Sequence, residues 1–293
     1  MRVTILTPTL NAERFIPDCL SSIRAQTYPR EKIQHLVLDG ESADATARLA
    51  REAGAEVDVA RDGSLYQAMN RGVALARGEI VGWLNADDVL RPNAVDAVAR
   101  AFRAAPNAEI VVGDWELASS RSREIVRARP DALQRIRLGR RHGGWIAPLA
   151  VFFRTSTLRA LGQYAASYRI AADLDLWLRT AAREPLPRVV HAGAVIGTFR
   201  AHPHSLSSGG TRLESARESA RVGLSWYENA SAPAGVRRYA LFIHRRYTYL
   251  QRMWEAGDRG FPTRAWAALA CYRELRALGP GTVRDMRTGV TDS

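Results

Sequence analysis

The chain has 293 residues, of which 46% are hydrophobic and 25% charged, a balance that excludes a disordered protein and is typical of a globular one. No run approaches the roughly 18 apolar residues of a membrane-spanning helix, and the first residues, MRVTILTPTLNAERF, lack the features of a signal peptide. We therefore expect a cytoplasmic protein. Cys19 and Cys271 lie far apart, so we expect two buried free thiols rather than a disulfide or a metal site.

Positive charge is concentrated in two parts of the chain. The formal net charge is +12, and Lys32 is the only lysine. Residues 212–293 contain fourteen arginines and eight acidic residues, which makes half of that charge, and a second group of arginines lies in 119–142. Such surfaces bind nucleic acids, anionic membranes or phosphorylated substrates. The alternative is solvated charge without a partner.

Apolar runs alternate with amphipathic runs over the first 115 residues. Expected strands cover residues 3–7, 33–38, 57–60, 80–84 and 110–112, and expected helices cover 15–23, 44–49, 65–76 and 92–104. Strands that alternate with helices predict a parallel, layered α/β sheet.

The alternation breaks after Trp115. We expect a hairpin or loops in 119–142, strands at 152–153, 189–190 and 195–199, a helix at 173–182, and helices from 212 onward with breaks at Pro233 and 260–262. The segment 207–210 is the best linker candidate. This pattern divides the chain into a domain of residues 1–210 and a basic helical extension of residues 211–293.

The segment EIVGWLNADD, residues 79–88, carries the clearest chemical signal. An apolar strand ends there at two adjacent carboxylates, Asp87 and Asp88, and ligands of open α/β sheets bind at the carboxyl ends of strands. Adjacent carboxylates repel unless a positive charge neutralises them, and a hard divalent cation that also binds substrate phosphates would do so. The alternative is that one of them caps the helix that begins near Pro92.

Four segments together indicate a family. They are VTILTPTLNAERF, VLDGESADAT, DGSLYQAMNRGVALARGEIVGWLNADD and YRIAADLDLWLR, in that order. Over residues 1–210 the chain resembles the family 2 glycosyltransferases, in particular those that build bacterial surface polysaccharides. The resemblance implies the GT-A fold, with a mostly parallel central sheet flanked by helices, and it does not extend to residues 212–293.

The resemblance implies a nucleotide pocket at the ends of the first strands. Asp39 matches the aspartate that recognises a uracil-like base, and Thr7, Pro8 and Thr9 would line the same pocket. One carboxylate can accept a hydrogen bond from the ring N–H of uracil. The alternative for Asp39 is turn formation or helix capping.

The donor sugar and ribose have their own candidates. Asp62 begins the donor-sugar region, in which Asn70 and Arg71 would approach sugar hydroxyls or phosphate. Guanidinium suits phosphate geometry, but Arg71 can also be a surface residue that complements the helix dipole. Asn85, Ala86 and Asp87 stand where the family usually has Asp-X-Asp, and the resemblance makes them candidate donor-binding residues. The Asn85 amide can bond a ribose hydroxyl.

The resemblance implies a divalent cation, Mn²⁺ or Mg²⁺, at the diphosphate. Asp87 and Asp88 are its expected ligands, and His202 would be a third ligand or a phosphate donor. Arg200, in the segment FRAHPHS, would lie near the diphosphate. The alternative for His202 is a surface loop histidine without a role.

Asp173 matches the position of the catalytic base. A carboxylate there would take the proton of the acceptor hydroxyl as that oxygen attacks the anomeric carbon. The alternative is an N-cap, and the family's usual preceding glutamate is Ala172 here. Asp175 is expected to face elsewhere on the helix, and Trp177 to be part of the core.

These residues predict a metal-dependent glycosyltransferase that moves a sugar from a nucleotide diphosphate, most simply UDP, to a glycan or polyprenyl-linked acceptor of the cell envelope, and the resemblance implies that it inverts the anomeric centre. A sugar nucleotidyltransferase would need a glycine-rich, arginine-containing turn after the first strand, where the chain has TPTLNAE. A non-catalytic nucleotide-sugar-binding or scaffold protein would lack the base or the metal carboxylates. A nucleic-acid binder would explain the charge but not these motifs.

The helical extension mixes arginines with aromatic residues: Trp226, Tyr227, Tyr239, Phe242, Tyr247, Tyr249, Trp254, Trp266 and Tyr272. Such mixtures suit a membrane interface. One hypothesis is therefore that residues 212–293 hold the enzyme peripherally against the inner face of the membrane. The other is a packing or dimerisation subdomain with a solvated basic face, in which case a homo-oligomer is expected.

Overall fold

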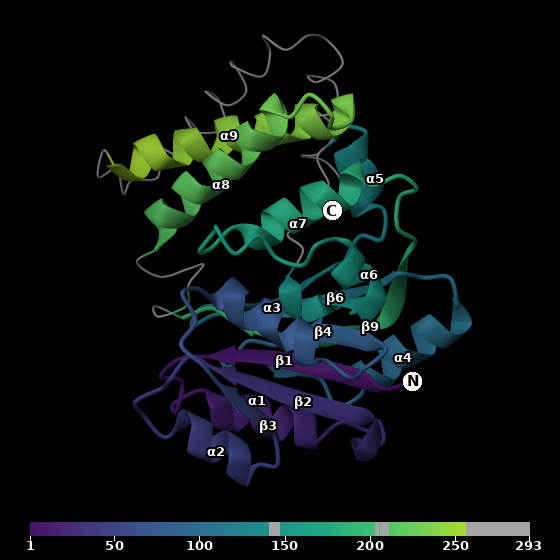
Figure 1. Cartoon of the computed structure of the whole chain (residues 1–293), viewed down its shortest axis with the longest axis vertical. Coiled ribbons are helices and arrows are strands. Elements are labelled where there is room, and N and C mark those ends of the chain that lie inside the picture. The colour runs from purple at the N-terminus through teal and green to yellow at the C-terminus, as the bar shows by residue number, and fades with distance from the viewer. Residues whose placement is uncertain (141–146, 203–204, 206–210, 256–293) are drawn as a thin grey trace.

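The computed structural model describes residues 1–140, 147–202, 205 and 211–255 (Figure 1). Several predictions lie outside these residues: Cys271, the linker 207–210, the break at 260–262, Trp266 and Tyr272. Cys19, which is described, is a buried free cysteine as expected.

Nine strands form one sheet. They are β1 (Val3–Thr9), β2 (Ile33–Asp39), β3 (Glu56–Val59), β4 (Ile80–Trp83), β5 (Val89–Leu90), β6 (Ile110–Ala118), β7 (Arg123–Val126), β8 (Val151–Arg154) and β9 (Val189–Arg200). Their order is β3-β2-β1-β4-β8-β6-β9-β5, and β7 pairs with β6.

Nine α-helices are described: α1 (Ile16–Arg24), α2 (Thr46–Glu52), α3 (Leu65–Leu75), α4 (Ala94–Ala104), α5 (Ala132–Arg137), α6 (Thr155–Ala160), α7 (Ala172–Ala182), α8 (Arg212–Glu228) and α9 (Ala234–Glu255). Two short 3₁₀ turns, Arg30–Lys32 and Pro148–Ala150, precede β2 and β8. The expected break between the last two helices falls at Pro233 as predicted.

The sheet is parallel in its first half and mixed in its second. Strands β3, β2, β1 and β4 are parallel neighbours, as the alternation of elements predicts. Thr9 lies opposite Asp39 in the β1–β2 register, so the ends of these strands meet at one edge. Strand β8 then inserts antiparallel between β4 and β6, whereas β9 runs parallel to β6. The fold class is confirmed, and the antiparallel β8 accounts for the break in alternation after Trp115.

The predictions for the second half differ in detail from the structure. The stretch 119–142 contains the β6–β7 hairpin, as expected, but also the helix α5. The two strands predicted at 189–190 and 195–199 form the single strand β9, which continues through Gly193 at a positive φ of 68°. Glycine adopts that conformation without strain. The gap predicted between residues 190 and 195 is therefore a local irregularity within one strand.

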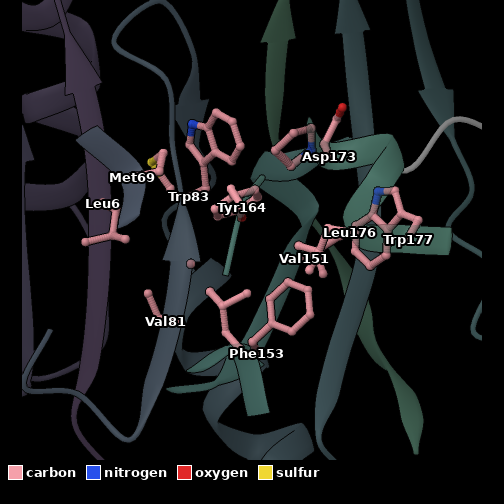
Figure 2. A pocket seen from close by; sticks show the side chains of 13 residues that line it. Leu6, Met69, Val81, Trp83, Val151, Phe153, Tyr164, Asp173, Leu176 and Trp177 are labelled. Atoms are coloured by element: carbon pink, nitrogen blue, oxygen red, sulfur yellow. The ribbon is translucent and has the colours of Figure 1, made fainter. Parts of the chain in front are cut away.

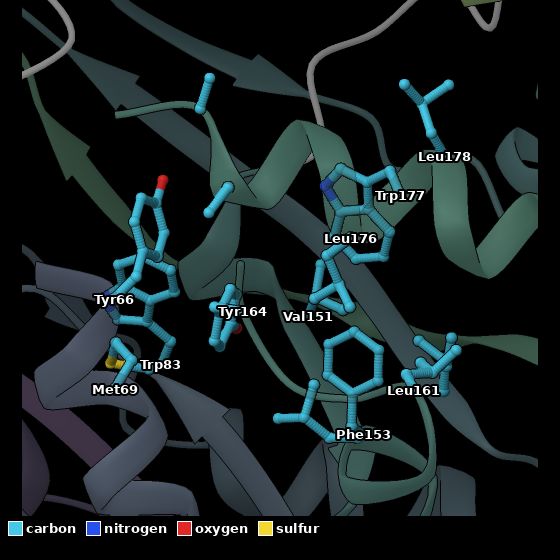
Figure 3. Close-up of a cluster of buried hydrophobic side chains, with 14 of the residues drawn as sticks. Tyr66, Met69, Trp83, Val151, Phe153, Leu161, Tyr164, Leu176, Trp177 and Leu178 are labelled. Carbon is cyan, nitrogen blue, oxygen red and sulfur yellow. The ribbon is translucent and has the colours of Figure 1, made fainter. Parts of the chain in front are cut away.

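Helices cover both faces of the sheet. Figure 1 shows α1 and α2 on one side and α3, α6 and α7 on the other, with α8 and α9 stacked outside α7. The buried cluster on the α7 side includes Tyr66, Met69, Trp83, Phe153 and Leu176, which interlock over the middle of the sheet (Figure 3). This layer of large side chains separates the sheet from α7 and forms the floor of the site described below.

The C-terminal helices belong to the same core. Val222, Val236, Tyr239 and Ile243, from α8 and α9, lie in one hydrophobic cluster with residues of the sheet and α7. The boundary predicted at residues 210–211 therefore does not coincide with a break in the hydrophobic core.

Most described aromatic residues of the extension face inward. Tyr239 is 5% exposed, and Trp226, Phe242 and Tyr247 pack partly buried against the core, whereas Tyr227 is 38% exposed. Within the part of the chain that the structure describes, no helix is long and apolar enough to cross a bilayer. The described aromatic residues thus favour the packing hypothesis for α8 and α9.

Candidate active site

The carboxylate loop, residues 85–88, follows β4 directly. The Asp88 side chain is fully buried: its Oδ1 accepts a hydrogen bond from the backbone N–H of Arg200 at 2.9 Å, and its Oδ2 accepts one from the Asn85 amide at 3.1 Å. Burial, together with the charge of Asp87, raises the pKa of Asp88 to about 8. Both oxygens of Asp88 thus already accept a hydrogen bond from the protein, and its role as a direct metal ligand stays a prediction.

Asn85 links this loop to the strand before it. Its side-chain oxygen accepts a hydrogen bond from the Trp83 indole N–H at 2.7 Å, while its nitrogen donates to Asp88. The adjacent Ala86 is buried. The amide predicted to bond a ribose hydroxyl is thus used within the loop, where it fixes the turn that carries Asp87.

Asp87 and His202 are brought together from segments 115 residues apart. Asp87 Oδ2 lies 3.0 Å from His202 Nε2, and both side chains are partly exposed. The His202 ring stacks on Phe15 with a centroid separation of 4.4 Å. Two adjacent ligands at about 2.1 Å from an octahedral ion lie about 3.0 Å apart, and a carboxylate with an imidazole is a donor set that divalent metals accept. This pair fits a cation, although no cluster of three acidic, cysteine or histidine side chains that could hold one occurs among the described residues.

Arg200 joins this corner to α1. Its Nε donates to the backbone carbonyl of Asp87, and its Nη1 lies 2.5 Å from Asp18 Oδ2. The guanidinium is partly exposed beside Asp87. The structure therefore brings together three of the residues predicted to surround the diphosphate: Asp87, Arg200 and His202.

Asp39 holds the turn after β2. Its Oδ2 accepts hydrogen bonds from the hydroxyls of Thr9 at 3.1 Å and Ser42 at 2.7 Å, and its Oδ1 accepts one from the Ser42 N–H at 2.8 Å. The residue is 1% exposed. Asp39 thus has the turn-forming role that we weighed against base recognition, and the base contact stays a prediction.

Thr7 lies in the protein interior. It is fully buried, and its hydroxyl lies 3.0 Å from His35 Nε2 and 4.0 Å from the sulfur of Cys19. Burial lowers the pKa of His35 to about 3 and raises that of Cys19 to about 12, so both groups are neutral. Thr7 thus belongs to a buried polar cluster beneath α1, and its place in a nucleotide pocket stays a prediction. Pro8 is buried as well. Thr9 is the last residue of β1, and its hydroxyl donates a hydrogen bond to Asp39.

The predicted donor-sugar residues are engaged with one another and with the backbone. Arg71 forms ion pairs with Asp58 and, at 2.6 Å, with Asp62. Asn70 donates to the Tyr164 carbonyl at 2.8 Å and accepts from its N–H at 2.9 Å. The Asn70 amide ties α3 to the segment before α7, and its contact with a donor hydroxyl stays a prediction. Arg71 is not a lone surface arginine, since two carboxylates neutralise it.

Asp173 lies in the first turn of α7. The N-cap is Ala171, so Asp173 is not the cap that we considered as the alternative. Its Oδ1 accepts from the Leu174 N–H at 2.8 Å and lies 3.5 Å from the Tyr66 hydroxyl. Burial raises the pKa of Asp173 to about 6. A carboxyl with this pKa is ionised at neutral pH and is more basic than an ordinary aspartate.

Asp173 borders a pocket between the sheet and α7 (Figure 2). Aromatic and aliphatic side chains make most of its wall, among them Met69, Trp83, Tyr164 and Leu176. Asp173 is the only charged side chain among the described residues that line it. Trp83 lines this pocket and donates its indole N–H to Asn85, so one wall of the pocket is hydrogen-bonded to the carboxylate loop.

Tyr66 and Tyr164 were missed as site residues. Their rings stack at 5.6 Å, and the Trp83 ring meets both edge-on at 5.9 and 5.4 Å. Burial raises the pKa of each tyrosine, so both keep their protons. Tyr66 lies within the segment DGSLYQAMNRG. Because a buried phenol needs a hydrogen-bond partner, its position in this segment could have indicated that it belongs to the site. No pattern pointed to Tyr164.

Comparison with known proteins identifies the family. The model of glycosyl transferase family 2 matches residues 4–164. The chain belongs to this family and is a glycosyltransferase. Among its relatives, an uncharacterized glycosyltransferase of Mycobacterium tuberculosis is 32% identical over 188 residues, which cover 61% of this chain and 68% of that protein. A PGL/p-HBAD biosynthesis glycosyltransferase of Mycobacterium bovis is 32% identical over 183 residues, with coverages of 60% and 68%.

Solved structures share the fold. Staphylococcus aureus TarS in complex with UDP-GlcNAc superimposes with a TM-score of 0.64 at 16% identity over 87% of this chain and 73% of that one. The mannosyltransferase PcManGT of Pyrobaculum calidifontis, in complex with GDP-Man and Mn²⁺, gives 0.59 at 21% identity, with coverages of 99% and 79%. A longer TarS chain is matched over 44% of its length. These likenesses establish the GT-A architecture.

Proposed function

We propose that this glycosyltransferase is metal-dependent and inverting, and that it transfers a sugar from a UDP-linked donor to a glycan or lipid-linked acceptor of the cell envelope. The observation that carries the proposal is the Asp173 carboxyl in its pocket, connected through Trp83 to the carboxylate loop. A general base in a pocket whose wall is hydrogen-bonded to the loop of the expected metal ligands suits a direct displacement.

In the proposed reaction Asp173 accepts the proton of the acceptor hydroxyl while that oxygen forms a bond to the anomeric carbon. The bond from this carbon to the diphosphate breaks, and its electron pair leaves on the diphosphate oxygen. Attack from the face opposite the leaving group inverts the anomeric centre. The raised pKa of Asp173 supports this role, because a more basic carboxylate drives the proton transfer further.

Asp87 and His202 would hold the cation, Mn²⁺ or Mg²⁺, which when bound neutralises charge on the departing diphosphate. Arg200 adds a fixed positive charge beside Asp87. It is held in place by Asp18, so it needs little rearrangement to face a phosphate group. The mannosyltransferase neighbour, which was solved with Mn²⁺, supports a metal at this corner.

The donor base and the acceptor class are each supported by separate observations. Asp39 offers an acceptor for the ring N–H of uracil, and the TarS neighbour was solved with UDP and with UDP-GlcNAc. Relatives are named for PGL/p-HBAD biosynthesis and, in Myxococcus xanthus, for O-antigen biosynthesis. An envelope glycan or a lipid-linked glycan is therefore the proposed acceptor.

A screen of nucleotide sugars for binding and slow hydrolysis, with Mn²⁺, Mg²⁺ or EDTA, tests the proposal. We expect one UDP-sugar to bind and to be hydrolysed in the presence of a metal, with EDTA suppressing hydrolysis. The absence of binding by every nucleotide sugar, with or without metal, would overturn the proposal. Retention of the anomeric configuration in a transfer product would overturn the inverting mechanism alone.

A further inference from the structure

A glutamate of the C-terminal helices reaches the start of the helix that carries Asp173. Glu218, on α8, is 6% exposed. Its Oε1 accepts a hydrogen bond from the Arg169 N–H at 2.7 Å, and its Oε2 accepts bonds from the N–H groups of Ile170 at 2.6 Å and Ala171 at 2.9 Å. One buried carboxylate thus takes three consecutive backbone donors.

These donors belong to Ala171, the N-cap residue of α7, and to the two residues before it. The first N–H groups of a helix have no partner within the helix, and a nearby serine, threonine or aspartate usually satisfies one of them. Here the N-cap is Ala171, which has no side-chain hydrogen bond to give. Glu218 orders the three residues that lead into α7, from a position 47 residues beyond Ala171, and its charge is favourable at a helix N-terminus.

A second bond joins the same two helices. The Trp226 indole N–H donates to Asp175 Oδ1 at 2.8 Å, and Asp175 Oδ2 is held by Arg179 at 2.5 Å. Glu218 and Trp226 are separated by eight residues, or about 12 Å along α8. Helix α8 therefore holds α7 at two points, one on each side of Asp173 in the sequence.

A short path of contacts connects Glu218 to Asp173. The N–H of Ile170 donates to Glu218, and the carbonyl of Ile170 accepts from the Tyr66 hydroxyl at 2.7 Å. The same hydroxyl lies 3.5 Å from Asp173 Oδ1. A displacement of Ile170 would move both the phenol and the first turn of α7.

We infer that Glu218 is a positioning residue for Asp173: by capping the entry to α7 it sets the place of the catalytic carboxylate in the pocket. This inference rests on the proposed role of Asp173. It gives the C-terminal helices a part in the reaction, although residues 212–293 carry no family motif. Glu218 itself does not line the Asp173 pocket.

The charge of Glu218 also acts on Asp173. It raises the pKa of Asp173, after the larger effect of burial. The other titratable groups that face Asp173 are Tyr66, from α3, and Tyr164, from the segment before α7. Arg221, from the same helix as Glu218, lies 3.5 Å from Glu218 Oε1. Replacing Glu218 with a neutral residue should lower the pKa of Asp173.

The test compares Glu218→Gln with Glu214→Gln in the full chain. Glu214 lies one turn earlier on α8, is half exposed, and pairs only with the Arg169 side chain at 3.2 Å, so its change controls for loss of charge. For E218Q we expect kcat of UDP-sugar hydrolysis to fall about tenfold or more, with donor Kd unchanged and the acid limb of the pH profile shifted to lower pH. For E214Q all three quantities should stay at wild-type values. Glu218→Asp, which keeps the charge, should restore the acid limb and part of kcat.

Wild-type kcat and pH profile in folded E218Q would overturn the inference while leaving the proposed function intact. If E218Q does not fold, Trp226→Phe carries the test, since it releases the second bond; it should lower kcat without changing donor Kd, and unchanged kcat would contradict the inference. If the wild-type enzyme neither binds nor hydrolyses any nucleotide sugar, the proposed function fails instead. In that case amide hydrogen exchange of residues 169–174 still tests the cap, because it should be faster in E218Q than in E214Q.

Discussion

The carboxylate loop and α7 hold their acidic side chains by different means. Asp88 is held by Asn85, three residues away, and by the backbone of Arg200, so its supports belong to the motif and to the last residue of β9. Asp173 has its helix entry capped by Glu218 and its second turn tied by Trp226, both from α8. The carboxylate loop is thus supported from its own motif and from the end of β9, whereas α7 depends on α8, which lies outside the residues that the family model matches.

The largest effect should follow from Asp173→Asn. Loss of a general base lowers the rate by about 10²–10⁴-fold, while donor Kd should not change, because the nucleotide residues lie on other elements. Single-turnover transfer or hydrolysis, with donor binding measured by calorimetry, checks this. Asp175→Asn is the matched control on the same helix: it weakens the contacts with Arg179 and Trp226, so we expect a lower melting temperature and only a small loss of kcat. Transfer at the wild-type rate in D173N would remove Asp173 from the role of base.

The next effect separates the two neighbouring carboxylates. Asp87→Asn should weaken the binding of Mn²⁺ about tenfold or more, because a metal ligand loses its charge, with little change in stability. Asp88→Asn should instead destabilise the fold by about 1–3 kcal/mol, because a buried acceptor of the Arg200 N–H is altered.

Metal titration of the donor complex and chemical unfolding of both variants distinguish these outcomes. If D88N lost metal affinity as strongly as D87N while keeping wild-type stability, that result would assign Asp88 as a direct metal ligand.

The pH profile gives an intermediate effect. Asp173 must be ionised to accept a proton, and its pKa is raised to about 6, so activity should be constant above that value and fall as the pH decreases through it. At pH 5 the ionised fraction is about one tenth, which predicts a roughly tenfold loss of kcat/KM. Stopped assays from pH 5 to 8, at saturating metal, measure this limb. An acid limb near pH 4, the range of an ordinary aspartate, would contradict the assigned environment.

The smallest effect on activity should follow from Asn70→Ala. The variant loses two hydrogen bonds to the Tyr164 backbone, which should cost about 1–3 kcal/mol of stability and leave donor Kd within about twofold. Thermal unfolding and donor binding on the same preparation check this. Gln67→Ala is a suitable control on α3, since its side chain contacts the backbone of Gly63 instead. A large rise in donor Kd with unchanged stability would instead indicate that Asn70 contacts the donor.

The predictable part of the fold was the part with local patterns. The apolar runs located β1, β2, β3 and β4, and the amphipathic runs located the helices between them. The antiparallel β8 and the short β5 were not foreseen as such, because pairing between strands distant in sequence has no local signature. Helix α5 was hidden in an arginine-rich stretch whose composition suggested loops.

Candidate residues were identified more reliably than their roles. Asp87, His202 and Arg200 do lie together, as the resemblance implied. Thr7, Asn70 and Asp88 match motif positions equally well, yet their side chains are taken up by buried hydrogen bonds. A motif indicates which residue types recur, but it does not distinguish a side chain that faces a ligand from one that holds the ligand's neighbours in place.

By itself the sequence determined the family, the layered α/β architecture and the acidic positions at the strand ends, since these depend on periodicity and on short motifs. Only the tertiary structure decided which oxygens of those acidic residues are free and how Asp173 is held. The physical reason is that the free energy of a buried carboxylate depends on every donor around it. For Asp173 those surroundings include Tyr66 from α3 and Glu218 from α8, which the chain brings together only on folding.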